Sequence, residues 1–167
     1  YRYLEKLCAF YCQNKKLDIK IIRTTSIYGP YDNFDEKKSH VVPALIKKID
    51  KIHKNLEVWG DPNVIRDFVY VDDLVRAMIN LVPKKTKEIF NFSSGTATSI
   101  KTLAMTLLDI TKKKKKIIFI FKNRSSAKFR VLNNNKFNKN ILKIKRTSLK
   151  DGLIKTYMWY KNDRKKN

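Results

Sequence analysis

One arginine in this sequence stands where a polar turn gives way to an apolar strand. Residues 59–73 read Trp-Gly-Asp-Pro-Asn-Val-Ile-Arg-Asp-Phe-Val-Tyr-Val-Asp-Asp, and the arginine is Arg66. A guanidinium in this position can enter a cleft and bind a phosphate through two parallel hydrogen bonds, while the adjoining strand fixes its stem. The alternative is structural, because Arg66 can instead form a salt bridge with Asp67 or Asp73.

The pattern Trp-Gly-x-x-x-x-x-Arg-Asp-Phe-x-Tyr-Val-Asp-Asp resembles a motif of the extended short-chain dehydrogenases, the NAD-dependent epimerase/dehydratase family. The resemblance implies that Arg66 binds the diphosphate of a nucleotide sugar. It also implies that Trp59 flanks the nucleotide base or the sugar. A buried tryptophan that only packs is the alternative for Trp59.

A second segment of the same kind follows the strand expected at residues 19–23. Residues 23–30 read Arg-Thr-Thr-Ser-Ile-Tyr-Gly-Pro and resemble the family's Arg-Pro-x-Asn-x-Tyr-Gly-Pro. Ligands of open α/β sheets bind beyond the carboxyl ends of the strands, where this polar loop begins. The resemblance implies that the backbone of Thr24, Thr25, Ser26 and Ile27 faces the nicotinamide of the cofactor. A plain turn that ends in Gly-Pro remains the alternative.

Residues 32–34 and 39–46 most resemble the GDP-L-fucose synthases, one branch of the family. They read Asp-Asn-Phe and Ser-His-Val-Val-Pro-Ala-Leu-Ile. The resemblance implies that His40 approaches the nicotinamide and substrate and that Lys48 approaches the nucleotide. Judged by itself, a lone histidine here is a helix-entry or surface residue.

The last third of the chain supplies another basic residue. Arg130 precedes the apolar pair Val131-Leu132, at the place where the family binds the diphosphate or sugar. We expect Arg66 and Arg130 to converge on one pocket from opposite walls. Residues 148–160 match the family's ending through Gly152, Thr156 and Trp159.

The order of these motifs predicts an α/β chain that forms the C-terminal half of a doubly wound, Rossmann-like fold with a small substrate-binding lobe. We expect this part to occupy residues 1–162 and a frayed tail to occupy residues 163–167. A dinucleotide-binding half would precede it, because the chain contains no Gly-x-Gly-x-x-Gly fingerprint.

The catalytic pair of the family is missing from the sequence. Tyr1 falls on the lysine position of the family's Tyr-x-x-x-Lys, so no catalytic residue is assigned. The resemblance implies NADP or NAD as the cofactor of the complete enzyme, which would be a homodimer. We expect no turnover from this chain alone.

Local patterns predict the elements that position these residues. The expected helices are 3–13, one beginning near Pro43, 73–81 capped by Asp72, 100–111 capped by Thr98 or Ser99, and one from Ser148. The expected strands are 19–23, 56–59, 88–92 and 117–121.

The net charge of +23 favours a competing function at first sight, because large basic excesses are typical of nucleic-acid-binding proteins. The excess is mostly lysine, which is more typical of a solvated surface, so we expect no specific nucleic acid as a partner. No segment has the composition of a membrane span, and Cys8 and Cys12 lack the neighbours of a metal site. A cytoplasmic enzyme fragment acting on a nucleotide sugar is therefore predicted. The alternatives are a UDP-glucose 4-epimerase or another epimerase or dehydratase of nucleotide sugars, and a non-enzymatic basic binding module.

Overall fold

The strands of the chain pair in four short sheets, as a computed structural model shows for residues 2–14, 17–35, 37–51, 54–120, 127–141 and 143–163. Three sheets are parallel pairs: β1 (Ile21–Thr24) with β6 (Ile89–Phe92), β2 (Ser26–Tyr28) with β5 (Phe68–Tyr70), and β3 (Leu56–Trp59) with β8 (Ile117–Ile120). In the fourth sheet, β4 (Ile65–Arg66) lies between antiparallel β7 (Thr98–Ser99) and parallel β9 (Phe129–Arg130). The α/β class and the parallel pairing are confirmed. The described strands form separate short sheets where the sequence predicted part of one wound sheet.

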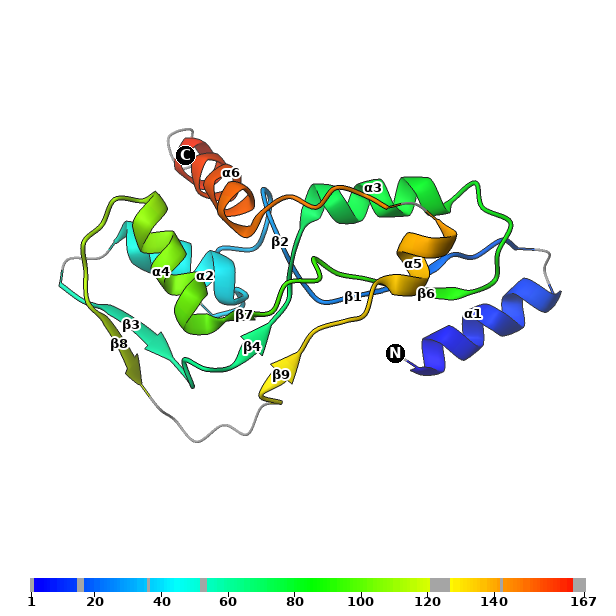
Figure 1. Ribbon diagram of the computed structural model, residues 1–167, viewed down its shortest axis with the longest axis horizontal. Helices are drawn as coiled ribbons and strands as arrows, with labels where there is room; N and C mark the ends of the chain where they lie inside the picture. The colour runs from blue at the N-terminus through cyan, green and yellow to red at the C-terminus, as the bar shows by residue number, and fades with distance from the viewer. Residues whose placement is uncertain are drawn as a thin grey trace.

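The helices gather at the two ends of an elongated molecule (Figure 1). At one end lie α2 (Val41–Asp50), α4 (Ile100–Ile110) and α6 (Leu149–Asp163). At the other end, α1 (Arg2–Asn14), α3 (Val71–Leu81) and α5 (Asn135–Asn140) surround β1 and β6. The β2–β5 pair therefore lies where the two ends meet.

The strand β5 separates two hydrophobic cores. Phe68 and Tyr70 belong to the core that α2, α4 and α6 form, whereas Val69 belongs to the core beneath α3. This division follows from strand geometry, because successive side chains point to opposite faces. All three side chains are almost completely buried, so β5 is fixed from both sides.

Most expected elements are present within two residues of their predicted bounds. Of the two residues expected to cap α4, Ser99 is the cap, and its side chain accepts a hydrogen bond from the Thr102 amide. The predicted Asp72 cap is wrong. Helix α3 begins one residue earlier, at Val71, so Tyr70 occupies the cap position and Asp72 lies in the first turn. Helix α6 extends to Asp163, and residues 164–167 of the predicted tail lie outside the described residues.

A buried carboxylate joins the end of β4 to a turn far along the chain. Asp67 has no exposed surface. It accepts hydrogen bonds from the Ser94 amide at 2.9 Å, the Ser94 hydroxyl at 2.6 Å and the Gly95 amide at 3.3 Å. Gly95 has a φ of +77°, a conformation that favours glycine. The turn after β6 and the strand that carries Arg66 are therefore held together.

Cys8 and Cys12 are half-buried free thiols. Within the described ranges, no helix combines the length and the apolar composition that crossing a bilayer requires.

We predict that Gly152→Ala destabilises the protein, although alanine normally favours a helix over glycine. A Cβ at Gly152 would overlap the Tyr28 hydroxyl and approach its Cζ to 2.9 Å. Overpacking of a buried contact costs about 1–3 kcal/mol, which outweighs the helix propensity gain of about 1 kcal/mol. Urea denaturation would measure the free energy of unfolding. The double variant with Tyr28→Phe should recover part of the loss, whereas a stabilised Gly152→Ala would contradict the packing of α6 against β2.

We also predict that Asp67→Asn lowers the free energy of unfolding by about 1–3 kcal/mol, because an amide donor would face the Ser94 and Gly95 amides. Asp18→Asn is the matched control, since the Asp18 side chain is exposed and forms an ion pair with Lys20. The control should change stability by less than about 1 kcal/mol. Equal effects of the two substitutions would show that Asp67 does not hold the turn.

Candidate functional site

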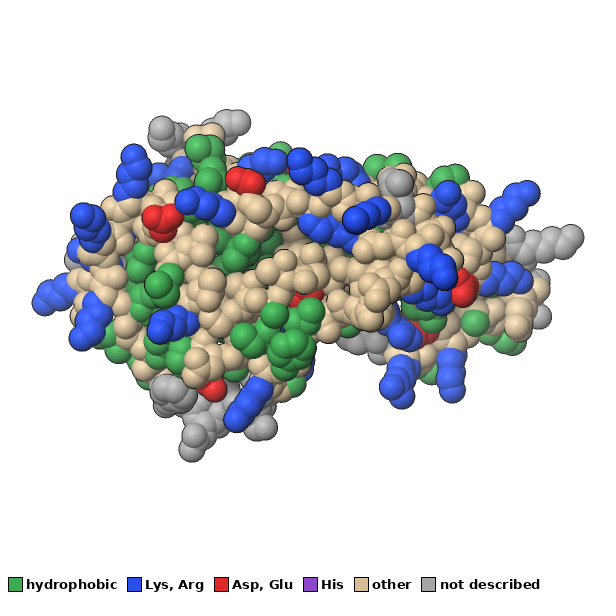
Figure 2. Space-filling model, viewed as in Figure 1, with side chains coloured by type: hydrophobic (Ala, Val, Ile, Leu, Met, Phe, Trp, Pro, Cys, Tyr) green, Lys and Arg blue, Asp and Glu red, His purple; other side chains and the backbone are tan. Residues whose placement is uncertain are grey.

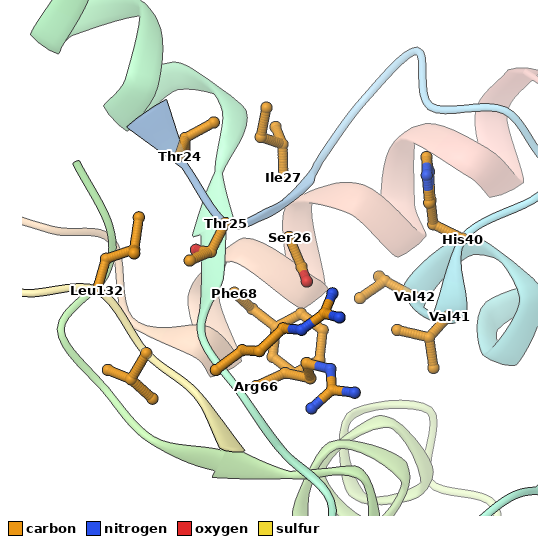
Figure 3. Close-up of a pocket in the computed structure, with 12 residues that line it drawn as sticks. Thr24, Thr25, Ser26, Ile27, His40, Val41, Val42, Arg66, Phe68 and Leu132 are labelled. Carbon is orange, nitrogen blue, oxygen red and sulfur yellow. The ribbon is translucent and has the colours of Figure 1, made fainter. Parts of the chain in front are cut away.

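The largest group of predicted site residues surrounds one cavity of about 680 Å³, which we call the Arg66–Arg130 cavity. Ligand pockets for small molecules commonly have this size. The cavity lies between the β1–β2 connection, the start of α2 and the paired strands β4 and β9 (Figure 3). Its lining comprises Thr24, Thr25, Ser26, Ile27, His40, Val41, Val42, Arg66, Phe68, Arg130, Val131 and Leu132.

Arg66 and Arg130 are direct neighbours across the β4–β9 pair, where their Cα atoms are in register. They converge on one cavity, as predicted, but from adjacent strands of one wall; the expectation of opposite walls is wrong. The Arg66 Nη1 donates to the carbonyls of Ile65 at 2.8 Å and Ala127 at 2.9 Å. These two bonds fix the guanidinium of Arg66 where it lines the cavity.

The two guanidiniums place a concentrated positive charge in the cavity, where Arg66 is half-buried and Arg130 is exposed. Partial burial lowers the pKa of Arg66, and the nearby charge of Arg130 lowers this pKa further. Arginine nevertheless stays charged at any physiological pH. None of the described residues that line the cavity is acidic. An anion with two negative charges would therefore relieve the repulsion between Arg66 and Arg130.

The segment Thr24–Ile27 forms the side of the cavity where β1 ends and β2 begins. The Ser26 amide donates to the Asp67 carbonyl at 3.2 Å, which ties this segment to the strand beside Arg66. The hydroxyls of Thr24 and Thr25 are buried, and neither has a hydrogen-bond partner among the described residues. Buried hydroxyls of this kind are suited to a ligand with polar atoms, such as a nicotinamide cofactor.

His40 stands at the N-cap position of α2 and lines the same cavity. Its side chain makes no capping hydrogen bond, while its carbonyl accepts the Ala44 amide at 3.0 Å. Val41 and Val42 follow it at the start of the helix, so the positive end of the α2 dipole also faces the cavity. The helix terminus therefore favours an anionic ligand.

Trp59 and Lys48 form a separate pair that does not line the cavity. The Lys48 Nζ lies 4.8 Å from the centre of the Trp59 ring and donates to the Glu57 carbonyl at 3.0 Å. Trp59 is 67% exposed, which excludes the alternative of a buried packing residue. The structure thus brings together these two predicted residues, but apart from Arg66 and Arg130.

Sequence reasoning missed part of the site. It considered Asp67 only as a salt-bridge partner for Arg66, whereas the carboxylate instead holds the Ser94–Gly95 turn. The only indication in the sequence was that Asp67 stands among apolar residues typical of a buried strand. Phe68, Val41 and Val42 also line the cavity, and their apolar character gave no indication of a site.

Some predictions concern residues or groups that the structure does not place. Tyr1, which falls on the family's lysine position, lies outside the described residues, as do residues 121–126 before Arg130. In the part of the chain that is described, no three His, Cys, Asp or Glu side chains gather closely enough to hold a metal ion.

Lysine and arginine side chains are scattered over the visible face of the molecule, with no single basic stripe among the described residues on that face (Figure 2). A nucleic-acid footprint is typically one continuous basic patch. The surface charge is thus distinct from the concentrated charge inside the Arg66–Arg130 cavity.

Comparison of this chain with known families and proteins identifies its relatives. Residues 2–93 match the model of the NAD dependent epimerase/dehydratase family. A probable GDP-L-fucose synthase 1 of Oryza sativa subsp. japonica is 31% identical over 160 residues, which make up 93% of this chain and 48% of the rice protein.

Two solved structures resemble the fold. A GDP-L-fucose synthetase from Naegleria fowleri bound to NADP has a TM-score of 0.89 and 21% identity, covering 98% of this chain and 52% of that one. A UDP-glucuronic acid 4-epimerase from Bacillus cereus, in complex with UDP-glucuronic acid and NAD, has a TM-score of 0.80 and 27% identity, covering 95% and 50%.

The chain spans about half the length of the relatives that it matches. The family model covers more than half of the chain and includes Arg66, the Thr24–Ile27 segment and His40. The chain therefore belongs to the NAD-dependent epimerase/dehydratase family.

Proposed function

We propose that this chain is the nucleotide-sugar-binding part of a NAD(P)-dependent epimerase or reductase, that it corresponds to the C-terminal half of its relatives, and that it is most similar in function to GDP-L-fucose synthase. The observation that carries the proposal is the pair of neighbouring guanidiniums, Arg66 and Arg130, in one cavity without a described acidic residue. A diphosphate supplies negative charge and several oxygen acceptors that two neighbouring guanidiniums can bind.

Side chains near the two arginines indicate how such a ligand would be oriented. The diphosphate binds to Arg66 and Arg130, and the sugar extends toward Ser26 and His40 on the facing side of the cavity. The exposed Trp59 and the Lys48 above its ring serve the nucleotide base. An aromatic face is a general platform for a base.

The cofactor is assigned to the Thr24–Ile27 side of the cavity. The Thr24 and Thr25 hydroxyls fit it, because both are buried without a partner among the described residues. A bound nicotinamide would supply hydride transfer to or from a sugar carbon. The residues of this chain hold the substrate beside it and exclude water; we assign no acid or base to them.

Two alternative functions predict different ligands. A UDP-sugar epimerase or dehydratase shares the same fold, and its diphosphate would use the same two arginines. A basic binding module would instead use the dispersed surface lysines, and the scattered arrangement in Figure 2 does not favour it. Such a module should bind polyanions equally well with or without Arg66.

We predict that Arg66→Ala and Arg130→Ala each weaken binding of a GDP-sugar by about 10–100-fold. A hydrogen bond to a charged group contributes about 1.5–3 kcal/mol, and about 1.4 kcal/mol corresponds to a tenfold change in affinity. Isothermal titration with GDP-mannose measures the dissociation constant. Lys85→Ala is the matched control, since it removes one positive charge from an exposed loop position outside the cavity.

The control should bind the GDP-sugar with a dissociation constant within about twofold of that of the unmodified protein. Arg66→Lys should have an affinity between those of the control and of Arg66→Ala, because lysine keeps the charge without the planar fork. Equal loss in Lys85→Ala and Arg66→Ala would mean that net charge alone governs binding, and would overturn the proposed site.

We further predict that GDP-sugars stabilise the protein against heat more than UDP-sugars do at equal concentration. At a given concentration, a ligand that binds the native state more tightly raises the melting temperature more. A thermal-shift panel of GDP-, UDP- and dTDP-sugars measures this order. A larger shift with UDP-sugars would favour the epimerase alternative over the GDP-L-fucose synthase-like function.

A further inference from the structure

Asn134 binds a turn that lies far from it in the sequence. Its Oδ1 accepts a hydrogen bond from the Ser93 amide at 2.7 Å, and its Nδ2 donates to the Ser93 carbonyl at 2.9 Å. Ser93 has no exposed surface and directly follows β6. The side-chain amide of Asn134 thus binds the Ser93 backbone as a neighbouring strand would, through one donor and one acceptor.

Capping a helix is the ordinary role of an asparagine in this place, and Asn134 does not perform it. The residue occupies the N-cap position of α5, but its side chain makes no capping hydrogen bond. The neighbouring Asn133 instead accepts the Asn135 amide at 2.8 Å. The side chain of Asn134 is therefore used to hold Ser93 and not its own helix.

The hydroxyl of Ser93 ties the same segment a second time. It lies 3.0 Å from the Leu132 carbonyl and 3.1 Å from the Asn134 Oδ1, and it can donate to either oxygen. The Arg146 Nε also donates to the Ser93 carbonyl at 3.2 Å, and its guanidinium lies 4.3 Å from the centre of the Phe92 ring. The chain after β9 is therefore fastened to a completely buried residue.

The segment that Asn134 fastens forms part of the Arg66–Arg130 cavity. Leu132 lines this cavity, and Arg130 stands two residues before it. Strand β9 is only two residues long, so its few ladder bonds specify the register weakly. A slip of one residue turns each side chain of a strand to the other face. Such a slip in β9 would replace Arg130 beside Arg66 with an apolar neighbour.

The contacts before β9 depend partly on an arginine that the ligand would engage. The Ile65 amide donates to the Lys128 carbonyl at 2.8 Å, and the Arg66 Nη1 donates to the Ala127 carbonyl at 2.9 Å. The second bond belongs to the guanidinium that lines the cavity. The bonds of Asn134 involve neither arginine, so they can hold the register of β9 whether or not a ligand is bound.

The strand of Arg66 is fastened to the same turn. Asp67, the residue after Arg66, accepts hydrogen bonds from the amides of Ser94 and Gly95, and Ser93 directly precedes them. The strand β4 and the segment after β9 are thus held by consecutive residues of one turn. Supporting hydrogen bonds of this kind keep the groups of a binding site at a fixed spacing.

We propose that Asn134 is a positioning residue for diphosphate binding: by fastening the segment after β9 to Ser93, it keeps β9 in register with β4 and holds Arg130 beside Arg66. The inference rests on the proposed diphosphate site and adds the side chain that sets its geometry. Asn134 is not among the described residues that line the cavity. It therefore acts through Arg130 and not through contact with the ligand.

A double-mutant cycle, measured by isothermal titration with GDP-mannose, tests this role. Asn134→Ala should weaken binding about 5–10-fold, less than Arg130→Ala does, because a displaced guanidinium binds less well than a positioned one. In the Arg130→Ala background, Asn134→Ala should change the dissociation constant by less than about twofold, because the side chain that it positions is gone. In the Arg66→Ala background, the full effect of Asn134→Ala should remain.

Asn140→Ala is the matched control for this cycle. It removes the same amide group from an exposed position at the end of α5, where the side chain donates to the Lys136 carbonyl of its own helix. The control should bind GDP-mannose like the unmodified protein. Ser93→Ala removes only the hydroxyl tie and is measured in the same way if Asn134→Ala does not fold, with a smaller loss of affinity that also disappears in the Arg130→Ala background.

Hydrogen exchange supplies a readout that needs no ligand. The Ile65 amide reports the pairing of β4 with the chain at β9, because it donates to the Lys128 carbonyl. Asn134→Ala should accelerate the exchange of this amide at least about fivefold and leave the amides of α4 unchanged, since only the local pairing is loosened.

Equal losses of affinity from Asn134→Ala in the unmodified and Arg130→Ala backgrounds would overturn the inference. Equal acceleration of the Ile65 and α4 amides would overturn it too, because Asn134 would then contribute only to overall stability. If Arg66→Ala and Arg130→Ala both bind GDP-mannose like the unmodified protein, the proposed ligand site fails instead. A selective change in the exchange of the Ile65 amide would still show that Asn134 sets the register of β9.

Discussion

The buried carboxylate of Asp67 is the interaction on which the arrangement of the cavity depends. It stands directly between Arg66, which enters the cavity, and Phe68, which lines it and begins β5. Its three hydrogen bonds to the Ser94–Gly95 turn fix the chain at this point, and its carbonyl accepts the Ser26 amide from the β1–β2 connection. Two walls of the cavity are thus joined through one residue that contacts no solvent.

The motifs allowed a good part of the site to be predicted from the sequence. Arg66, Arg130, His40 and the Thr24–Ile27 segment all line one cavity, because motif residues of this family resemblance lie at strand ends and helix starts that the fold brings together. Helix and strand positions followed from hydrophobic periodicity, which is strong in α2, α4 and β3.

The remainder depends on contacts between distant segments. Asp67 binds a turn 27 residues further along the chain, and local patterns contain no information about such a partner. The neighbouring positions of Arg66 and Arg130 follow from the register of β4 and β9, which a two-residue strand does not reveal in sequence. The cap of α3 was misassigned because Asp72 is a good capping residue, yet β5 leads into the helix without an intervening turn.

The division of the hydrophobic interior at β5 also limits how such a protein can change its ligand. Phe68 forms part of the cavity wall and of one core, and Val69 beside it belongs to the other core. A substitution in β5 that reshaped the cavity would disturb packing on both sides of the strand. Evolution toward a different ligand is therefore expected to proceed through the start of α2 and through the residues after β9, where side chains can vary without disturbing two interiors at once.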